Sequence, residues 1–198
     1  MGKIITIVGN SGVGKTTLAH ALCQVGPFIT GVEPPLGERP FQALTVVEPS
    51  RYALANQVDF LLLRAEQERA LRDDPIHGVI DGGLDLDFHG FTRLFHHRGY
   101  LDEVEFSLLA RLHGNLRQLL GPPDLILHLI APLAVIAERY ARRGRTLEIA
   151  QQDDLALMDR FIAEWLDGAI DTPVMAIDAS ADDLYEPQAL AALATRIA

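Results

Sequence analysis

Residues 9–16 have the types and the spacing needed to hold the phosphates of a nucleotide. They read Gly9-Asn10-Ser11-Gly12-Val13-Gly14-Lys15-Thr16, which fits the pattern G-x-x-x-x-G-K-[ST]. Glycines let the backbone turn tightly, so that successive N–H groups point toward phosphate oxygens. Lys15 would reach the outer phosphates, and the Thr16 hydroxyl would bind Mg²⁺. We therefore expect this loop, together with Thr17, to bind ATP or GTP.

The segments on either side of the loop have the character that the motif requires. Lys3–Val8 is short, apolar and rich in β-branched residues, as expected for a buried strand. Lys15–Val25 is typical of a helix, whose amino end would add partial positive charge at the phosphates. The order of strand, glycine loop and helix favours a phosphate-binding loop over a chance match.

Two acidic residues follow predicted strands and are candidates for chemistry beside the phosphates. Asp81 ends the apolar run Gly78–Asp81 and would hold Mg²⁺ together with Thr16; the alternative is an acid that caps the next turn. Glu33 follows the predicted strand Phe28–Val32 and would be a general base toward an acceptor hydroxyl; the alternative is a solvated loop acid. Ligands of open α/β sheets bind at the carboxyl ends of the strands, where both acids would lie.

A basic cluster occupies the segment Glu138–Arg145. Its spacing of three and four residues places several arginines on one side of a helix. Arginines on a segment above a phosphate loop would stabilise charge during phosphoryl transfer, so we predict a lid near residues 140–152. The alternative is a solvated helix face whose charges pair with Glu138 and Glu148. The arginines in question are Arg139, Arg142, Arg143 and Arg145.

Acids and histidines also gather in Asp85–His89 and at His96-His97. Their spacing matches no familiar pattern of metal ligands. A solvated surface segment explains this composition equally well, and we expect no metal site there.

The composition favours one globular enzyme domain. The chain has 198 residues, of which 48% are hydrophobic and 22% charged, enough for a sizeable core. A net charge of −10 argues against a general nucleic-acid binder. Cys23 is the one cysteine and is expected in the core. We find no signal peptide and no apolar run of ~18 residues, so we expect no membrane span and a cytoplasmic location.

Strand-like and helix-like segments alternate along the chain, which predicts an α/β fold with a parallel sheet covered by helices on both faces. Pro34–Pro40 is rich in proline and glycine and is expected to form a loop. The predicted strands are Lys3–Val8, Phe28–Val32, Val79–Asp81, Leu125–Ile130 and Val174–Asp178. The predicted helices are Lys15–Val25, Ser50–Arg72, Glu103–Leu120, Pro132–Arg143, Asp153–Leu166 and Pro187–Ile197.

Taken together, these residues resemble the deoxynucleoside kinase family over nearly the whole chain. Only the phosphate loop is specific by itself, and the order and spacing of the other segments supply the rest. Those segments are Glu33-Pro34, Gln57 with Phe60–Arg64, His97–Glu103, Pro123–Leu129, Arg139–Glu148 and Glu164–Leu166.

The resemblance implies a P-loop NTPase fold with five parallel strands in the order 2-3-1-4-5, an arginine-rich lid, and a homodimer built through helices. It implies ATP and Mg²⁺ as cofactors, with residues 1–198 as a single kinase domain. Glu33 matches the family's general base, which deprotonates the 5′-hydroxyl of a deoxynucleoside. Arg142, Arg143 and Arg145 resemble the lid arginines.

The resemblance also implies several contacts to the nucleoside. Gln57 matches the glutamine that hydrogen-bonds the base, and Tyr52 falls where an aromatic residue often lines the base pocket. Glu148 matches the lid acid that meets the 3′-hydroxyl. Arg64 belongs to the matched segment on the same predicted helix, and we expect it on the substrate side.

The chain departs from the family after the third strand. The family usually carries an acid-Arg-Ser triplet there, whereas this chain reads Asp81-Gly82-Gly83. In the family, that arginine helps to hold the general base and the reacting oxygen. Either Arg93, Arg98 or Arg64 substitutes for it, or the acceptor differs, or activity is weak. The family tyrosine that contacts the 3′-hydroxyl is replaced by Val46 in the register set by Gln57.

Two other functions compete with a nucleoside kinase. A thymidylate-type monophosphate kinase would need arginines to clamp the acceptor phosphate, and the arginine missing after Asp81 counts against it. A nucleotide-binding regulatory subunit would explain the Gly82-Gly83 departure. The evidence against it is that four expected site residues are intact, namely Lys15, Thr16, Glu33 and Asp81. Product analysis with MgATP and a panel of nucleosides and monophosphates separates all three.

Overall fold

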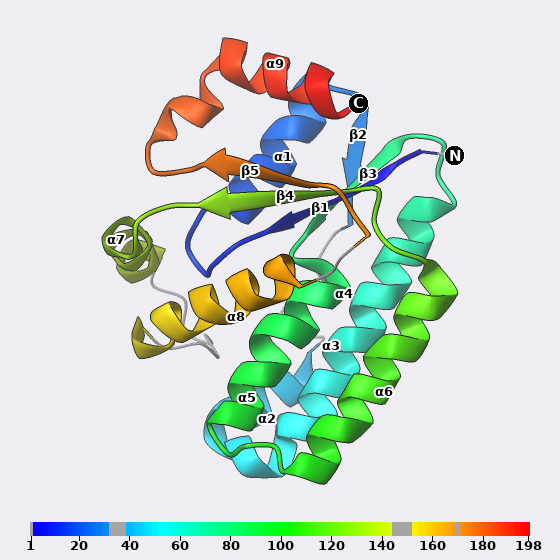
Figure 1. Cartoon of the computed structure of the whole chain (residues 1–198), viewed down its shortest axis with the longest axis vertical. Coiled ribbons are helices and arrows are strands. Elements are labelled where there is room, and N and C mark those ends of the chain that lie inside the picture. The colour runs from blue at the N-terminus through cyan, green and yellow to red at the C-terminus, as the bar shows by residue number, and fades with distance from the viewer. Residues whose placement is uncertain (1, 32–38, 144–151, 169–170) are drawn as a thin grey trace.

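The computed structural model of the chain describes residues 2–31, 39–143, 152–168 and 171–198. Its centre is a sheet of five parallel strands in the order β2-β3-β1-β4-β5, which confirms the predicted order (Figure 1). All five residues of β1 are buried, because this strand is central and has helices on both faces. The strands are β1 (Ile4–Val8), β2 (Phe28–Thr30), β3 (His77–Asp81), β4 (Leu125–Ile130) and β5 (Val174–Asp178).

Helices cover both faces of this sheet. Helices α1 (Lys15–Val25) and α9 (Pro187–Ile197) lie on one face, where Leu18, Leu22 and Leu190 enter the largest apolar cluster of the protein (Figure 1). The opposite face carries α3, α4, α6 and α8. These helices span Pro49–Arg72, Gly83–Leu86, Glu103–Leu120 and Leu155–Asp167, and α7 spans Leu133–Arg143.

The sequence analysis did not predict the helix that precedes α3. Helix α2 spans Pro40–Val47 and packs against α3, close to the segment that was expected to be a loop. Pro40 occupies the first turn of α2, where a missing N–H costs no hydrogen bond. A proline at this position therefore begins a helix instead of ending a loop.

The segment 83–97 corrects a second prediction, because it is not a solvated surface segment. It consists of α4, the π-helical segment η2 (Asp87–Thr92) and α5 (Arg93–His97). Asp85 and Asp87 are only 7% and 5% exposed. Carboxylates are buried at such positions when basic partners compensate for the lost water.

Asp85 obtains that compensation from α6. Its carboxylate lies 2.9 Å from Nε2 of His113 and accepts a 2.8 Å hydrogen bond from Arg117, which also donates to Glu68 of α3 at 2.9 Å. Burial pushes the pKa of Asp85 upward, but the His113 hydrogen bond and the Arg117 charge outweigh it, so this pKa lies below the ordinary value. The network joins α3, α4 and α6 and anchors the chain between Asp81 and Asp87.

The described part of the chain holds no helix with the length and hydropathy needed to cross a bilayer.

Candidate active site

The glycine loop links β1 to α1 and has a backbone that side chains would disturb. Gly12 and Gly14 have φ values of +86° and +114°, in the region that favours glycine. A Cβ on Gly14 would lie 2.5 Å from the Tyr185 hydroxyl, and one on Gly12 would lie 3.2 Å from the carbonyl oxygen of Ile136. The loop therefore needs glycine both for its turn and for its close contact with α7 and the residues before α9.

The ammonium group of Lys15 lies inside the curve of this loop. Its Nζ donates hydrogen bonds to the carbonyl oxygens of Gly9 and Asn10, at 3.0 and 2.9 Å. Backbone N–H groups and a fixed cation at a helix amino end form a site suited to phosphate oxygens. The geometry agrees with the role predicted for the loop.

Thr16 and Asp81, the two predicted magnesium ligands, lie in contact. The Thr16 hydroxyl donates a 2.5 Å hydrogen bond to Oδ2 of Asp81. Strand β3 brings Asp81 beside Ile7 of β1, and the glycine loop follows β1 directly. Mg²⁺ prefers oxygen ligands, and the Thr16 hydroxyl and the Asp81 carboxylate supply two of them beside the phosphate loop, so this pair fits the ion.

The Asn10 side chain faces the protein interior instead of the phosphates. It is 1% exposed, and its Nδ2 donates a 2.6 Å hydrogen bond to the carbonyl oxygen of Leu155 at the start of α8. Its Oδ1 accepts a 2.8 Å hydrogen bond from the backbone N–H of Ser11. Asn10 thus fixes the loop to α8, and only its backbone is left for a nucleotide.

We predict that Asn10→Ala loosens the loop. The change removes the side-chain hydrogen bonds to Leu155 and Ser11, and a hydrogen bond of this kind typically contributes about 0.5–1.5 kcal/mol to the free energy of unfolding. Denaturant unfolding should show this loss, and the KM for ATP should rise because the loop is less well ordered. An unchanged unfolding midpoint with an unchanged KM would show that the tie to α8 is dispensable.

The other predicted loop residues take different places. Val13 is fully buried in the core, Thr17 is exposed in the first turn of α1, and Ser11 lines the cavity described next. Only Ser11 among these three is placed to offer its side chain to a ligand.

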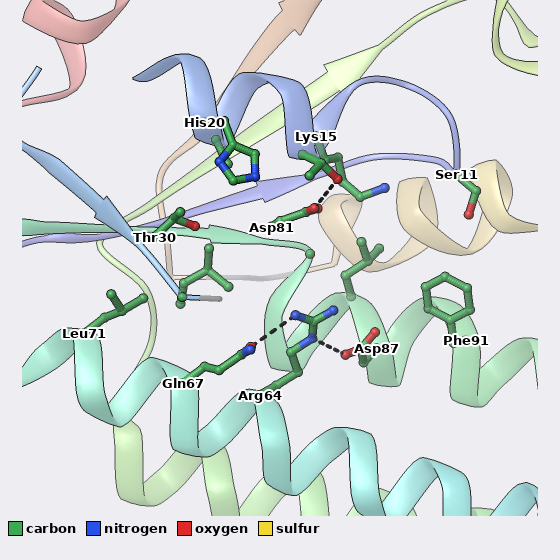
Figure 2. Close-up of a pocket in the computed structure, with 16 residues that line it drawn as sticks. Ser11, Lys15, His20, Thr30, Arg64, Gln67, Leu71, Asp81, Asp87 and Phe91 are labelled. Carbon is green, nitrogen blue, oxygen red and sulfur yellow. Dashed lines mark hydrogen bonds and ion pairs between the residues drawn. The ribbon is translucent and has the colours of Figure 1, made fainter. Parts of the chain in front are cut away.

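A cavity of about 330 Å³ opens beside the Thr16–Asp81 pair (Figure 2). Its walls come from α1, β2, α3, the turn after β3 and η2. The polar and charged side chains in these walls include Lys15, Thr16, His20, Arg64, Asp81 and Asp87. The cavity therefore connects the phosphate loop with a second polar group on α3 and η2.

That second group is a buried ion pair. Arg64 Nε donates a 2.7 Å hydrogen bond to Oδ2 of Asp87, and Arg64 Nη1 donates to Oε1 of Gln67 at 3.1 Å (Figure 2). Arg64 and Asp87 are only 8% and 5% exposed. A guanidinium and a carboxylate side by side present hydrogen-bond donors and an acceptor on one wall. Phe91 adds an aromatic ring to the same cavity.

Two predicted base-contacting residues are not among the described residues that line the cavity. Gln57 is 2% exposed, and its Oε1 accepts a 2.8 Å hydrogen bond from the Thr92 hydroxyl of η2. Tyr52 is half-buried on α3, with the Arg51 guanidinium 5.1 Å from its ring centre. The structure thus places Arg64, but neither Gln57 nor Tyr52, at the cavity.

Of the three arginines considered as substitutes for the missing family arginine, one lies at the site. Arg93 donates to Glu164 at 2.5 Å and lies over the Phe161 ring, and Arg98 pairs with Asp154. Arg64 is the one among the three that lines the cavity. Its guanidinium is already engaged by Asp87 and Gln67.

Helix α7 carries the described part of the predicted lid arginines. Arg139 Nη1 donates a 2.6 Å hydrogen bond to the carbonyl oxygen of Ala179, which follows β5. Arg142 pairs with Glu138 on the exposed side of α7, as the alternative interpretation of this cluster expected. Three further predicted residues, Glu33, Arg145 and Glu148, lie outside the described residues.

Sequence reasoning missed His20, Gln67, Asp87 and Phe91, which all line the cavity. His20 comes four residues after Thr16, and Gln67 three after Arg64, so helical spacing alone places each beside a predicted site residue. Asp87 carried no comparable signal, because its partner Arg64 lies on another helix.

The sheet order, the glycine loop and the Thr16–Asp81 contact are those of a P-loop nucleotide-binding protein. A sequence model of the deoxynucleoside kinase family matches residues 5–197. The chain therefore belongs to the deoxynucleoside kinase family, which confirms the resemblance and the fold that it implied.

Individual relatives agree with this assignment. The chain is 31% identical to a deoxyadenosine kinase of Dictyostelium discoideum over 147 residues, which are 74% of this chain and 59% of that protein. It is 24% identical to a deoxyadenosine/deoxycytidine kinase of Bacillus subtilis over 191 residues, covering 94% of this chain and 87% of that protein. The structure of a deoxyadenosine kinase from M. mycoides with bound products superimposes with a TM-score of 0.80 at 17% identity and covers 98% of both chains.

Proposed function

We propose that this protein transfers the γ-phosphoryl group of ATP to the 5′-hydroxyl of a deoxynucleoside. The observation that carries the proposal is the shared cavity, which joins Lys15, Thr16 and Asp81 to the Arg64–Asp87 pair. One end offers the groups that phosphoryl transfer needs, and the other offers groups that recognise a base.

At the donor end, the loop backbone and Lys15 would hold the outer phosphates. Thr16 and Asp81 would hold Mg²⁺, which neutralises charge on the phosphates when it is bound. Asn10 would keep the loop backbone in place through its hydrogen bond to Leu155. These residues position the donor and do not exchange atoms with it.

At the acceptor end, Arg64 and Asp87 would read the base, and Phe91 would stack on it. Structures of the M. mycoides enzyme contain dCMP or dATP. Adenine and cytosine both carry an exocyclic amine beside an unprotonated ring nitrogen. Asp87 would accept a hydrogen bond from the amine, and Arg64 would donate one to the ring nitrogen. We therefore propose that the acceptor is a deoxynucleoside with an amino-substituted base.

The remaining site residues stay as predictions from the resemblance. Glu33 would remove the proton of the 5′-hydroxyl, and Gln57 and Tyr52 would contact the base. Glu148 would meet the 3′-hydroxyl. Gln57 Oε1 already accepts a hydrogen bond from Thr92, so its amide N–H groups are the ones that would contact the base.

The purified protein with MgATP tests the function directly. We expect deoxyadenosine, deoxycytidine or both to yield the 5′-monophosphate and ADP, as identified by chromatography and mass spectrometry. Deoxynucleoside monophosphates serve as the second set of acceptors. Phosphorylation of monophosphates alone would favour the thymidylate-type alternative, and turnover of no acceptor would favour a regulatory subunit.

The lid arginines give a prediction of their own. Replacing Arg142 and Arg145 together by alanine should lower kcat more than nucleoside affinity, because charge stabilisation is needed chiefly in the transition state. Steady-state kinetics with varied nucleoside separates kcat from KM. A rise in KM at unchanged kcat would place these arginines in ground-state binding.

We also propose a cytoplasmic homodimer that forms through α3 and α6. These helices pack side by side and leave apolar side chains on their outer surfaces (Figure 1). Val104 and Leu119 of α6 are 78% and 84% exposed, and Leu62 of α3 is 43% exposed. Exposed apolar residues on neighbouring helices are typical of an interface between subunits. Sedimentation equilibrium measures the molar mass that decides this point.

A further inference from the structure

Thr92 is the last residue of η2 and has a fully buried hydroxyl group. Its Oγ1 donates toward two acceptors, Oε1 of Gln57 at 2.8 Å and the carbonyl oxygen of Asp87 at 3.1 Å. Thr92 and Gln57 are 0% and 2% exposed, so neither side chain is accessible to bulk water. Buried hydroxyls are usually hydrogen-bonded. The partners distinguish this one, because Asp87 lines the cavity and Gln57 is predicted to contact the base.

The hydroxyl lies where the backbone of η2 takes its shape. η2 is a π-helical turn, and such turns are rare and frequent at functional sites. The N–H of Arg93 bonds the carbonyl of Phe88, five residues earlier, which is the π spacing. The Thr92 hydroxyl reaches the carbonyl of Asp87, which is also five residues earlier. Thr92 therefore holds the backbone of Asp87 at the start of the turn.

This turn carries the part of the cavity wall that would face the base. Asp87 and Phe91 both belong to η2, and both line the cavity (Figure 2). Asp87 would accept a hydrogen bond from the amine of the base. An N–H···O hydrogen bond forms only at donor–acceptor distances of about 2.7–3.2 Å. The position of the η2 backbone therefore decides whether Asp87 reaches the base.

Thr92 also fixes the distance between η2 and α3. Gln57 and Arg64 are seven residues apart, about two helical turns, so they lie on the same side of α3. Two contacts join that side of α3 to η2. The Arg64–Asp87 ion pair lies at the start of η2, and the Gln57–Thr92 hydrogen bond lies at its end. The hydroxyl thus acts on Asp87 and Gln57 directly, and on Arg64 through Asp87.

The contact with Thr92 also sets the rotation of the Gln57 amide. With Oε1 turned to the Thr92 hydroxyl, the amide has its N–H groups to offer a ligand. Adenine and cytosine present an unprotonated ring nitrogen that accepts such a bond, whereas thymine presents an N–H at the same ring position as cytosine. A site whose buried polar groups are fixed rejects a base that leaves them unpaired. A Gln57 amide that could turn over would lose this preference.

We propose that Thr92 is a positioning residue that sets base specificity, because its hydroxyl holds Asp87 and the Gln57 amide where they read an amino-substituted base. The inference rests on the proposed function, since it requires that the acceptor is a nucleoside. Thr92 is not among the described residues that line the cavity, and it acts only through these two partners.

The test compares wild type with Thr92→Val, which keeps the shape of the side chain and removes its hydroxyl. The quantity measured is kcat/KM for deoxyadenosine, deoxycytidine and thymidine with saturating MgATP. For the better of the two amino-substituted nucleosides it should fall about 3- to 10-fold, as expected for the loss of one hydrogen bond. For thymidine it should fall less, so the ratio between the two nucleosides decreases. The KM for ATP should stay within about twofold, because the phosphate loop is unchanged.

Further variants separate positioning from stability. Thr92→Ser keeps the hydroxyl and should restore the wild-type ratio. Thr172→Val removes another buried hydroxyl, which donates to the Pro123 carbonyl at 3.2 Å and lies outside the cavity. It should lower the thermal unfolding midpoint as Thr92→Val does and leave the ratio unchanged. If circular dichroism shows that Thr92→Val is unfolded, Thr92→Ala removes the same hydroxyl without added apolar volume and takes its place.

A reduced ratio in Thr92→Val, with recovery in Thr92→Ser and no change in Thr172→Val, supports the inference. An unchanged ratio in the folded variant overturns it and leaves the kinase function standing, because the hydroxyl then serves stability alone. An equal fall for all three nucleosides overturns it as well. If wild type phosphorylates no nucleoside, the proposed function fails and this inference fails with it.

Discussion

Replacing Lys15 by alanine should abolish phosphoryl transfer and leave the fold intact. The Lys15 side chain places its ammonium group inside the glycine loop, where Nζ lies 3.0 Å from the Gly9 carbonyl oxygen. A nucleotide would draw this cation to its outer phosphates, where charge develops during transfer. Loss of a preorganised charge at a transition state typically lowers kcat by about 10²–10³-fold or more.

The measurement is turnover with MgATP and the best nucleoside from the panel. The Lys15 side chain is partly exposed and lies outside the apolar clusters, so the unfolding midpoint should change little. Lys15→Arg is the matched control, because it keeps the charge but presents a planar fork that fits the loop poorly. Wild-type turnover in Lys15→Ala would refute the phosphate-binding role of the loop.

Glu33→Gln should remove most turnover on nucleosides while ATP binding stays near that of the parent. A sugar hydroxyl is a poor nucleophile, and a positioned carboxylate base contributes about 10²–10⁴-fold. Glutamine keeps the shape of the side chain and loses its charge.

The same variant separates two kinds of acceptor. A monophosphate is already ionised near neutral pH and needs no base, so its phosphorylation should not depend on Glu33. Glu48→Gln is the matched control, since Glu48 is exposed and pairs with Arg51 away from the cavity. If Glu33→Gln phosphorylated nucleosides at the parental rate, the mechanism with Glu33 as base would fail.

Much of the fold follows from local sequence patterns. The predicted strands and most helices agree with the structure to within two residues, because apolar runs and caps are local features. The strand order came from the family resemblance and is confirmed. Local patterns failed for 83–97, where burial of Asp85 depends on His113 and Arg117 of another helix.

The site residues, like the fold, could be predicted only where a local sequence pattern specifies them. Thr16 and Asp81 could be expected near each other, because a motif and a strand end specify their positions, and they are in contact. The side chain of Asn10 could not be placed, since its partner Leu155 is remote in sequence. The choice of Arg64 over Arg93 and Arg98 also needed the structure. Each of these arginines is held in place by an ion pair with an acidic residue on a different element, and the sequence alone does not reveal those pairs.

The central position of β1 has a consequence for how the chain folds during synthesis. β1 is synthesised before the other four strands of the sheet, yet it lies between β3 and β4, with Ile5 opposite Val79 on one side and Leu125 on the other. At about 5–20 residues per second, the strand Ile4–Val8 waits on the order of ten seconds for β4. An apolar strand without neighbours is prone to aggregate. A chain truncated before β4 should therefore need chaperone protection that the full-length chain does not.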